Sequence, residues 1–337
     1  MGSASPVVWM IDALQGQRGA PPQDPQGALP GDQLAGVRWG APATRQPHGL
    51  GDTGGLGGLA SARDGRRGRS RTYSDVAIET GHLLRLAFGR PWRQTEGLLR
   101  SLATLLGLDI GVPDHTTFSR RSPGLSLARS LAEAQRSGPV HVVIDATGLK
   151  VYGAGEWLTE KHGERGRRTW RKLHLAVDPA SGEILASELT TTEEGDAALV
   201  GPLLDQITGA IASVTADGAY DGEPVYRAVA ERQPDPPAAV IIPPRASAVP
   251  NPTADTTPSQ RDQHIRMIQD KGRLGWQKAV GYGKRSLGET AVFRYKTIIG
   301  RSLRARTLSS QKTEARVACS VLNRMTRLGM PVSQRIA

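Results

Sequence analysis

The chain contains one cysteine, Cys319, among its 337 residues. This excludes an internal disulfide and any zinc site built from several thiolates of one chain. No apolar run reaches the roughly 18 residues that a membrane-spanning helix needs, so we expect no membrane partner. The N-terminus also lacks a basic segment followed by an apolar one, which makes secretion unexpected. These absences favour a protein of the reducing cytoplasm.

Acidic residues are in the minority, with 32 Asp and Glu against 43 Lys and Arg. The net charge of +11 favours a polyanionic partner, and nucleic acid is the commonest one. The alternatives are a charge that serves solubility alone and an arginine content raised by a GC-rich genome.

Residues 1–66 lack regular apolar spacing apart from the short run Val7–Leu14 and are rich in Gly, Pro and Ala. Such a segment buries too little apolar surface to offset the entropy of ordering, so we predict a disordered leader. Alternatively, residues 1–66 are the product of a shifted reading frame or of a misplaced start codon.

Helical spacing predicts two helices after Tyr73, one ending near Gly89 and one near Gly107. Pro113-Asp114 then opens a short basic element, HTTFSRR. A helix-turn-helix places such an element in a DNA groove, and the alternative is a helical cap on a neighbouring domain. The candidate DNA contacts on it are His115, Thr116, Thr117, Ser119, Arg120 and Arg121.

Two short apolar runs further along the chain each stop at an acid. Val140–Ile144 ends at Asp145, and Val214–Ala216 leads into Asp217. Apolar runs of this length predict buried strands that present a carboxylate at their ends. Between these two strands we predict a hairpin, with strands over 172–177 and 183–189, and then a helix over 196–207. After them we predict a helix over 223–232, a strand over 238–242 and two further helices over 260–280 and 312–328.

A third acid lies in the stretch GYGKRSLGETAVFRYK. On one helix, Tyr282, Arg285, Glu289 and Lys296 would fall within an arc of about 60°. A carboxylate flanked by cations suits a site that holds metal and phosphate together. The alternatives are a charged stripe that only faces water, and a capping box in which Ser286 begins the helix and Glu289 reaches back to it.

Asp145, Asp217 and Glu289 can converge if both strands are adjacent and the helix packs beside them. Their oxygens are the ligands that Mg²⁺ prefers, and two such ions can promote attack on a phosphodiester. Each aspartate taken alone is more commonly a turn-former or cap.

With these motifs the chain resembles the DDE transposases of the bacterial insertion-sequence-five group, which carry a Y-R-E-K signature. Tyr282, Arg285, Glu289 and Lys296 match that signature, while VIDATGLKVYG and TADGAYD resemble the motifs of the first two acids. The resemblance covers about residues 73–328. It implies an α/β fold, with a ribonuclease H-like mixed sheet flanked by helices.

The resemblance also implies metal-dependent cleavage at transposon ends and strand transfer into target DNA. Asp145, Asp217 and Glu289 would be the catalytic triad and would hold two Mg²⁺ ions, with Mn²⁺ as a substitute. Tyr282, Arg285 and Lys296 would hold the DNA strand near the scissile phosphate.

The basic stretch 153–171 follows the first acid and carries two tryptophans. We predict a long loop in which Trp157, Arg167 and Arg168 contact DNA. The alternative is a solvated loop whose tryptophans pack on the sheet.

The predicted organisation is a leader (1–66), a helical DNA-binding region (67–136), a catalytic domain (137–330) and a tail (331–337). The predicted partners are duplex DNA, as terminal inverted repeats and target, and a second copy of the chain, because synapsis joins two ends. The expected location is the cytoplasm, at the nucleoid. Two alternatives stay open: an inactive remnant that only binds DNA, and a nuclease that cuts without joining.

Overall fold

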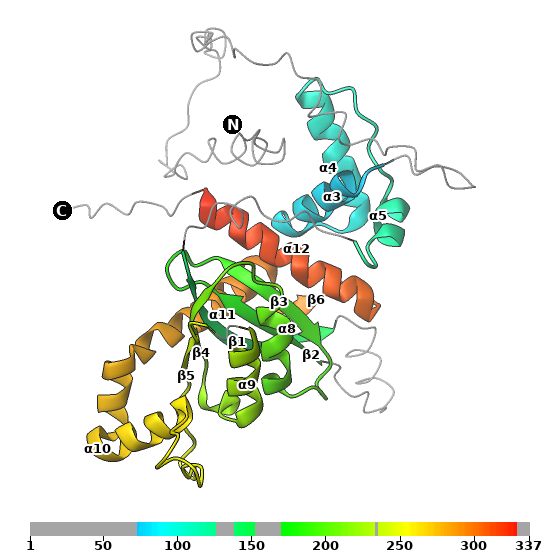
Figure 1. The fold of residues 1–337 in the computed structure, drawn as a ribbon. Helices are drawn as coiled ribbons and strands as arrows, with labels where there is room; N and C mark the ends of the chain where they lie inside the picture. Colours follow the sequence, from blue (N-terminus) through cyan, green and yellow to red (C-terminus); the bar gives the residue numbers. More distant parts are fainter. Residues whose placement is uncertain (1–72, 126–137, 152–169, 233–234, 329–337) are drawn as a thin grey trace, which may run out of the picture. The chain divides into compact units, whose positions relative to one another are not determined.

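A six-stranded mixed sheet organises the described part of this computed structural model, residues 73–125, 138–151, 170–232 and 235–328. Its strands are β1 (Val140–Val151), β2 (Trp170–Val177), β3 (Ile184–Thr190), β4 (Ile211–Thr215), β5 (Ala239–Ile241) and β6 (Ser302–Leu303). They lie in the order β3-β2-β1-β4-β5, with β6 beside β1. Strand β2 runs antiparallel to both of its neighbours, β1 and β3, whereas β4 and β6 run parallel to β1 and β5 runs parallel to β4. A mixed sheet flanked by helices confirms the predicted fold class (Figure 1).

The chain divides into two units, Met1–Ser74 and Asp75–Ala337, and every element described here belongs to the second. The predicted leader lies outside the described residues. No helix in the described part is long and apolar enough to span a membrane.

Strand β1 is longer than its apolar run. The residues 142–144 are almost fully buried, as expected of a central strand covered on both faces. The strand does not end at Asp145, as predicted, but continues for six more residues. Lys150 pairs there with Trp170 of β2 and with Ser302 of β6. Hydrogen-bonded strands on both sides therefore stabilise an extended segment that the composition of residues 146–151 does not predict.

One face of the sheet is covered by α8 (Val200–Leu204) and α9 (Glu223–Arg232). Val142 and Ile144 of β1 belong to the core beneath these helices. The helix predicted over 196–207 begins as a 3₁₀ turn, Asp196–Leu199, before α8, whereas α9 has the predicted bounds.

The opposite face carries α11 (Ser286–Arg294), which lies against β1 and β2, and α12 (Leu308–Arg327), which lies against β3. Since side chains alternate along a strand, Val143 faces this second layer, and its Cγ1 lies close to Gly288 of α11. Helix α12 starts earlier than predicted because Thr307 caps it, accepting a hydrogen bond from the Ser310 amide.

The long helix α10 (Gln260–Val280) confirms the helix predicted over that range. Ser259 and Asp262 form a capping box at its start, and Gly272 interrupts its regular geometry with φ 69° and ψ 168°. The helix ends at Gly281, whose φ of 67° is left-handed and suits glycine.

The predicted three-helix unit consists of α3 (Asp75–Ala87), α4 (Trp92–Leu105) and α5 (His115–Arg121). Helix α3 packs on α12, where the buried Arg85 guanidinium lies 3.7 Å from the Glu314 carboxylate. The unit therefore rests on the helix that also covers β3.

Candidate active site

The first predicted acid, Asp145, lies in the middle of β1 on the face covered by α11. Its Oδ1 accepts a hydrogen bond of 2.9 Å from the Ala146 amide, and its side chain is 14% exposed. A carboxylate in this position is held by the centre of the sheet but still reaches the surface.

The second acid, Asp217, follows β4, the neighbour of β1, as predicted. It caps a 3₁₀ turn, Gly218–Tyr220, by accepting a hydrogen bond of 2.8 Å from the Ala219 amide through Oδ1. Its side chain is 37% exposed, and Oδ2 faces the guanidinium of Arg285 at 3.5 Å.

The third acid, Glu289, lies in the first turn of α11. The predicted single helix is in fact three consecutive pieces: a 3₁₀ turn (Tyr282–Arg285), α11 and a π-helix (Tyr295–Ile299). The capping-box alternative placed the start of the helix correctly at Ser286. Its hydrogen bonds are not formed, because the Ser286 hydroxyl donates to the Gly283 carbonyl and Glu289 pairs with Arg285 instead.

Arg285 lies between all three acids. Its Nη2 is 4.0 Å from Asp145 Oδ1 and 3.5 Å from Asp217 Oδ2, and its Nη1 donates to Glu289 Oε1. Its Nε is buried and has no hydrogen-bond partner among the described residues. Three carboxylates that are far apart in the sequence therefore surround one guanidinium.

The charges at this point perturb one another. Burial raises the pKa of Asp145 above its ordinary value, and the charges of Asp217 and Glu289 act in the same direction. The Ala146 amide and Arg285 oppose this shift. For Arg285 burial alone would lower the pKa, but the surrounding carboxylates raise it. The site favours a positive charge at its centre.

The donor set suits a divalent cation. All three groups are carboxylates, from three different elements, and hard cations such as Mg²⁺ prefer oxygen ligands. Within the described residues, no three His, Cys, Asp or Glu side chains are already placed as a metal site. The guanidinium of Arg285 stands between the carboxylates instead, so a cation that met all three would have to displace it.

Two further residues of the Y-R-E-K signature flank the acids. The ring of Tyr282 lies 5.3 Å from that of Trp276 on α10, and burial raises the pKa of its hydroxyl. Lys296 lies on the π-helix and is half-buried. The predicted DNA contacts Trp157, Arg167 and Arg168 fall outside the described residues.

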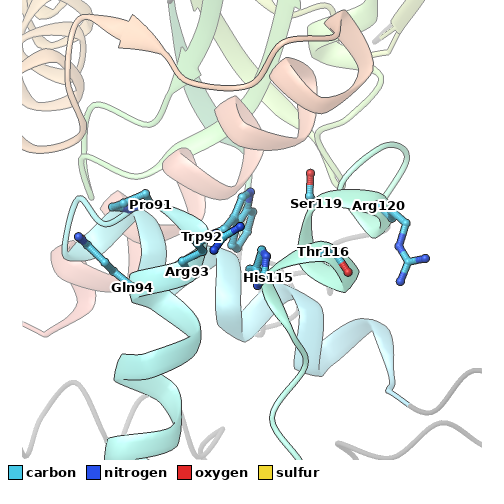
Figure 2. Close-up of a pocket in the computed structure, with 8 residues that line it drawn as sticks. All are labelled: Pro91, Trp92, Arg93, Gln94, His115, Thr116, Ser119 and Arg120. Carbon is cyan, nitrogen blue, oxygen red and sulfur yellow. The ribbon is translucent and has the colours of Figure 1, made fainter.

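The predicted contacts on α5 lie beside a surface hollow of about 590 Å³. It is lined by Pro91, Trp92, Arg93, Gln94, His115, Thr116, Ser119 and Arg120. Figure 2 shows Trp92 and His115 between the start of α4 and α5, with Arg93 on one side and Arg120 on the other. Within the described residues neither arginine forms an ion pair, and no acid lines the hollow.

Several side chains of α5 already have partners within the protein. The hydroxyls of Thr116 and Thr117 donate to Asp114, the N-cap of the helix, and Arg121 pairs with Asp75. Arg93 and Gln94 also line the hollow, although neither was among the predicted contacts. The signal was available, because Pro91 starts a helix and so places both residues in its first turn.

Ring contacts and hydrogen bonds join α4 to α5 beside the hollow. Trp92 stacks on Phe118 with ring centroids 5.1 Å apart and planes 4° apart, and the Arg85 guanidinium lies 4.6 Å from the Trp92 centroid. The His115 amide donates to Glu96, and its ring Nδ1 lies 2.9 Å from the same carboxylate. Helices α4 and α5 are thereby fixed relative to each other.

Two models of known protein families match the sequence of this chain. A family model described as a transposase DDE domain matches residues 136–324, and a second with the same description matches residues 58–154. The solved piggyBac transposase synaptic complex with hairpin DNA is 11% identical, with a TM-score of 0.28 over 81% of this chain and 77% of that one. The first match spans more than half of the chain, and the chain therefore belongs to the DDE transposase family.

Proposed function

We propose that this protein is a transposase of the insertion-sequence-five group that cleaves DNA at transposon ends and joins them to target DNA. The observation that carries the proposal is the convergence of Asp145, Asp217 and Glu289 on Arg285. Carboxylates gathered at the surface of a basic protein suit chemistry on a phosphodiester.

In this proposal the three carboxylates hold two Mg²⁺ ions, with Mn²⁺ as a substitute. When bound, such ions polarise the phosphodiester and favour ionisation of the attacking water or 3′-hydroxyl. Arg285 leaves the carboxylates and binds the scissile phosphate, for which its forked geometry and its Nε, which has no hydrogen-bond partner among the described residues, are suited. Lys296 adds a second positive charge, and Tyr282 supports the strand by stacking or by a hydrogen bond to phosphate.

The DNA extends over α5 and the adjoining hollow in this account. Arg93 and Arg120 contact phosphates from opposite sides, and His115 and Thr116 lie between them. Thr117 and Arg121 are also predicted contacts. They bind the duplex once its phosphates replace their present partners, Asp114 for Thr117 and Asp75 for Arg121. Trp157, Arg167 and Arg168 contact the transposon end. The partners are inverted-repeat and target DNA and a second copy of the chain, at the nucleoid.

Asp217→Ala tests the proposal on duplexes that carry the inverted repeats flanking the gene. We expect strand transfer to be lost while end binding stays within about twofold, because the change removes a metal ligand and no DNA-reading group. Asp255→Ala removes an exposed carboxylate that pairs with Arg266 and serves as the control. Strand transfer that persisted in Asp217→Ala would refute the metal assignment.

The same assay separates the alternatives. An inactive remnant would bind the ends but leave them uncut in Mg²⁺, and a simple nuclease would produce cut ends without joined product. Joined product from the unchanged protein, with a short target duplication, is the result that supports a transposase.

A further inference from the structure

A buried ion pair fixes the chain directly after Asp217. The Asp221 carboxylate is fully buried and receives two hydrogen bonds from Arg261, from Nε at 2.7 Å to Oδ1 and from Nη2 at 3.0 Å to Oδ2. The Arg245 amide donates a third, at 2.9 Å, to Oδ2. All of these partners come from segments at least 24 residues further along the chain.

The turn that Asp217 caps is also held from its carbonyl side. The Arg245 guanidinium donates to the Gly218 carbonyl at 3.5 Å and to the Ala219 carbonyl at 3.3 Å. Tyr220, in the same turn, is buried in the sheet core. Hydrogen bonds or core packing therefore hold each residue of the backbone from Asp217 to Asp221.

Arg261 is itself held in place by the N-terminal turn of α10. Arg261 lies in the first turn of α10, where Ser259 and Asp262 form the capping box. Asp262 also accepts a hydrogen bond of 2.8 Å from the Asn251 amide, and Arg261 Nη1 donates to the Val249 carbonyl at 3.3 Å. The start of α10 thus holds both the loop that contains Arg245 and the turn after β4.

Stability alone does not account for such a pair. Removing two charges from water costs several kcal/mol, and their attraction roughly returns that cost, so an apolar pair of similar volume would serve as well. The pair fixes an orientation instead, because the guanidinium fork donates both hydrogen bonds only when the carboxylate lies in its plane. That orientation is transmitted through three residues to the carboxylate of Asp217.

We propose that Asp221 and Arg261, assisted by Arg245, are positioning residues that set the place of the Asp217 carboxylate relative to Asp145 and Glu289. The pair thereby determines how tightly the acids bind a divalent cation. This inference rests on the proposed function, since it assumes that Asp217 is a metal ligand.

The test is Mn²⁺ binding to the full-length protein without DNA, measured by calorimetry together with the free energy of unfolding. We expect Asp221→Asn and Arg261→Lys each to weaken Mn²⁺ binding about tenfold, and Arg245→Ala to weaken it severalfold. Arg261→Lys keeps the charge and removes only the fork, so it remains informative if Asp221→Asn does not fold. Combining Asp221→Asn with Arg261→Lys should add little to either change, because both act on one interaction.

Glu79→Gln is the matched control. It also removes the charge of a buried carboxylate beside an arginine, Arg324 at 3.6 Å, but on α3 and away from the acids. We expect it to lower stability and to leave Mn²⁺ binding unchanged. If folded Asp221→Asn and Arg261→Lys bind Mn²⁺ as tightly as the unchanged protein, while Asp217→Asn does not, the positioning role is refuted and the proposed function stands. If Asp217→Asn itself binds Mn²⁺ normally, the proposed function fails and this inference with it.

Discussion

Gly288 lies directly against Asp145. A Cβ at position 288 would be 3.1 Å from the Asp145 Cβ and 3.1 Å from Val143 Cγ1, closer than most such contacts. The helix that carries Glu289 can approach the central strand this closely because Gly288, the residue before Glu289, has no side chain. The distance between the first and third acids therefore depends on a glycine.

Gly288→Ala should separate Glu289 from Asp145. Alanine favours the helix by up to about 1 kcal/mol, whereas crowding in a packed site costs about 1–3 kcal/mol. We expect a net loss of about 1 kcal/mol in unfolding free energy and at least a tenfold loss of strand transfer. Gly283→Ala is the control, because no described residue lies within 4 Å of a Cβ there. Equal strand transfer in the two variants would show that the close approach is unimportant.

Asp145→Asn should stabilise the metal-free protein at neutral pH. The pKa of Asp145 is raised by burial, so the native state binds more protons than the unfolded state between the ordinary and the raised pKa. Its contribution to stability is therefore largest when it is protonated and is lost as pH rises through that window. Thermal unfolding between pH 4 and pH 8 should show a gain for the variant that grows with pH. A gain that is independent of pH would contradict this account.

Arg285→Ala should increase the Mn²⁺ affinity of the protein without DNA, because it removes the guanidinium that stands between the carboxylates. It should also weaken DNA binding and reduce the salt dependence of that binding by about one phosphate contact. Lys284→Ala removes the same charge from the preceding, exposed position and serves as the control. Unchanged Mn²⁺ affinity in Arg285→Ala, measured by calorimetry, would be inconsistent with this competition.

Arg93→Ala tests the hollow between α4 and α5. We expect weaker DNA binding, with the slope of log K against log salt reduced by about 0.9, the value for one phosphate. Arg90→Ala is the matched control, since Arg90 is exposed and lies three residues away but does not line the hollow. Titrations at several salt concentrations check this, and identical slopes for the two variants would exclude a phosphate contact at Arg93.

Local patterns predicted the elements that local chemistry determines. Helices α5 and α9 have the predicted bounds, and Asp217 follows its strand as expected. In each case a cap, a proline or an apolar run marks the boundary within a few residues. The convergence of the acids was predicted on the condition that their strands are adjacent, because nothing local in the sequence determines which strands are neighbours.

The errors have a common cause in tertiary contacts. Strand β1 passes through Asp145 because β2 and β6 pair with its second half, and β6 itself has only two residues. The position of Arg285 among the three acids likewise depends on packing between α11 and the sheet. Neither Asp221 nor Arg261 stood out in the sequence, because their pairing spans 40 residues.

The claim that three distant carboxylates share one metal site can be tested by cleavage of the backbone with bound Fe²⁺. Iron at such a site generates hydroxyl radicals, which cut the chain close to the metal. We expect cuts near Asp145, Asp217 and Glu289 in the same molecule, suppressed by excess Mg²⁺ and lost at all three positions together in Asp217→Ala. Cuts at only one of the three, or cuts that persist in Asp217→Ala, would contradict the shared site.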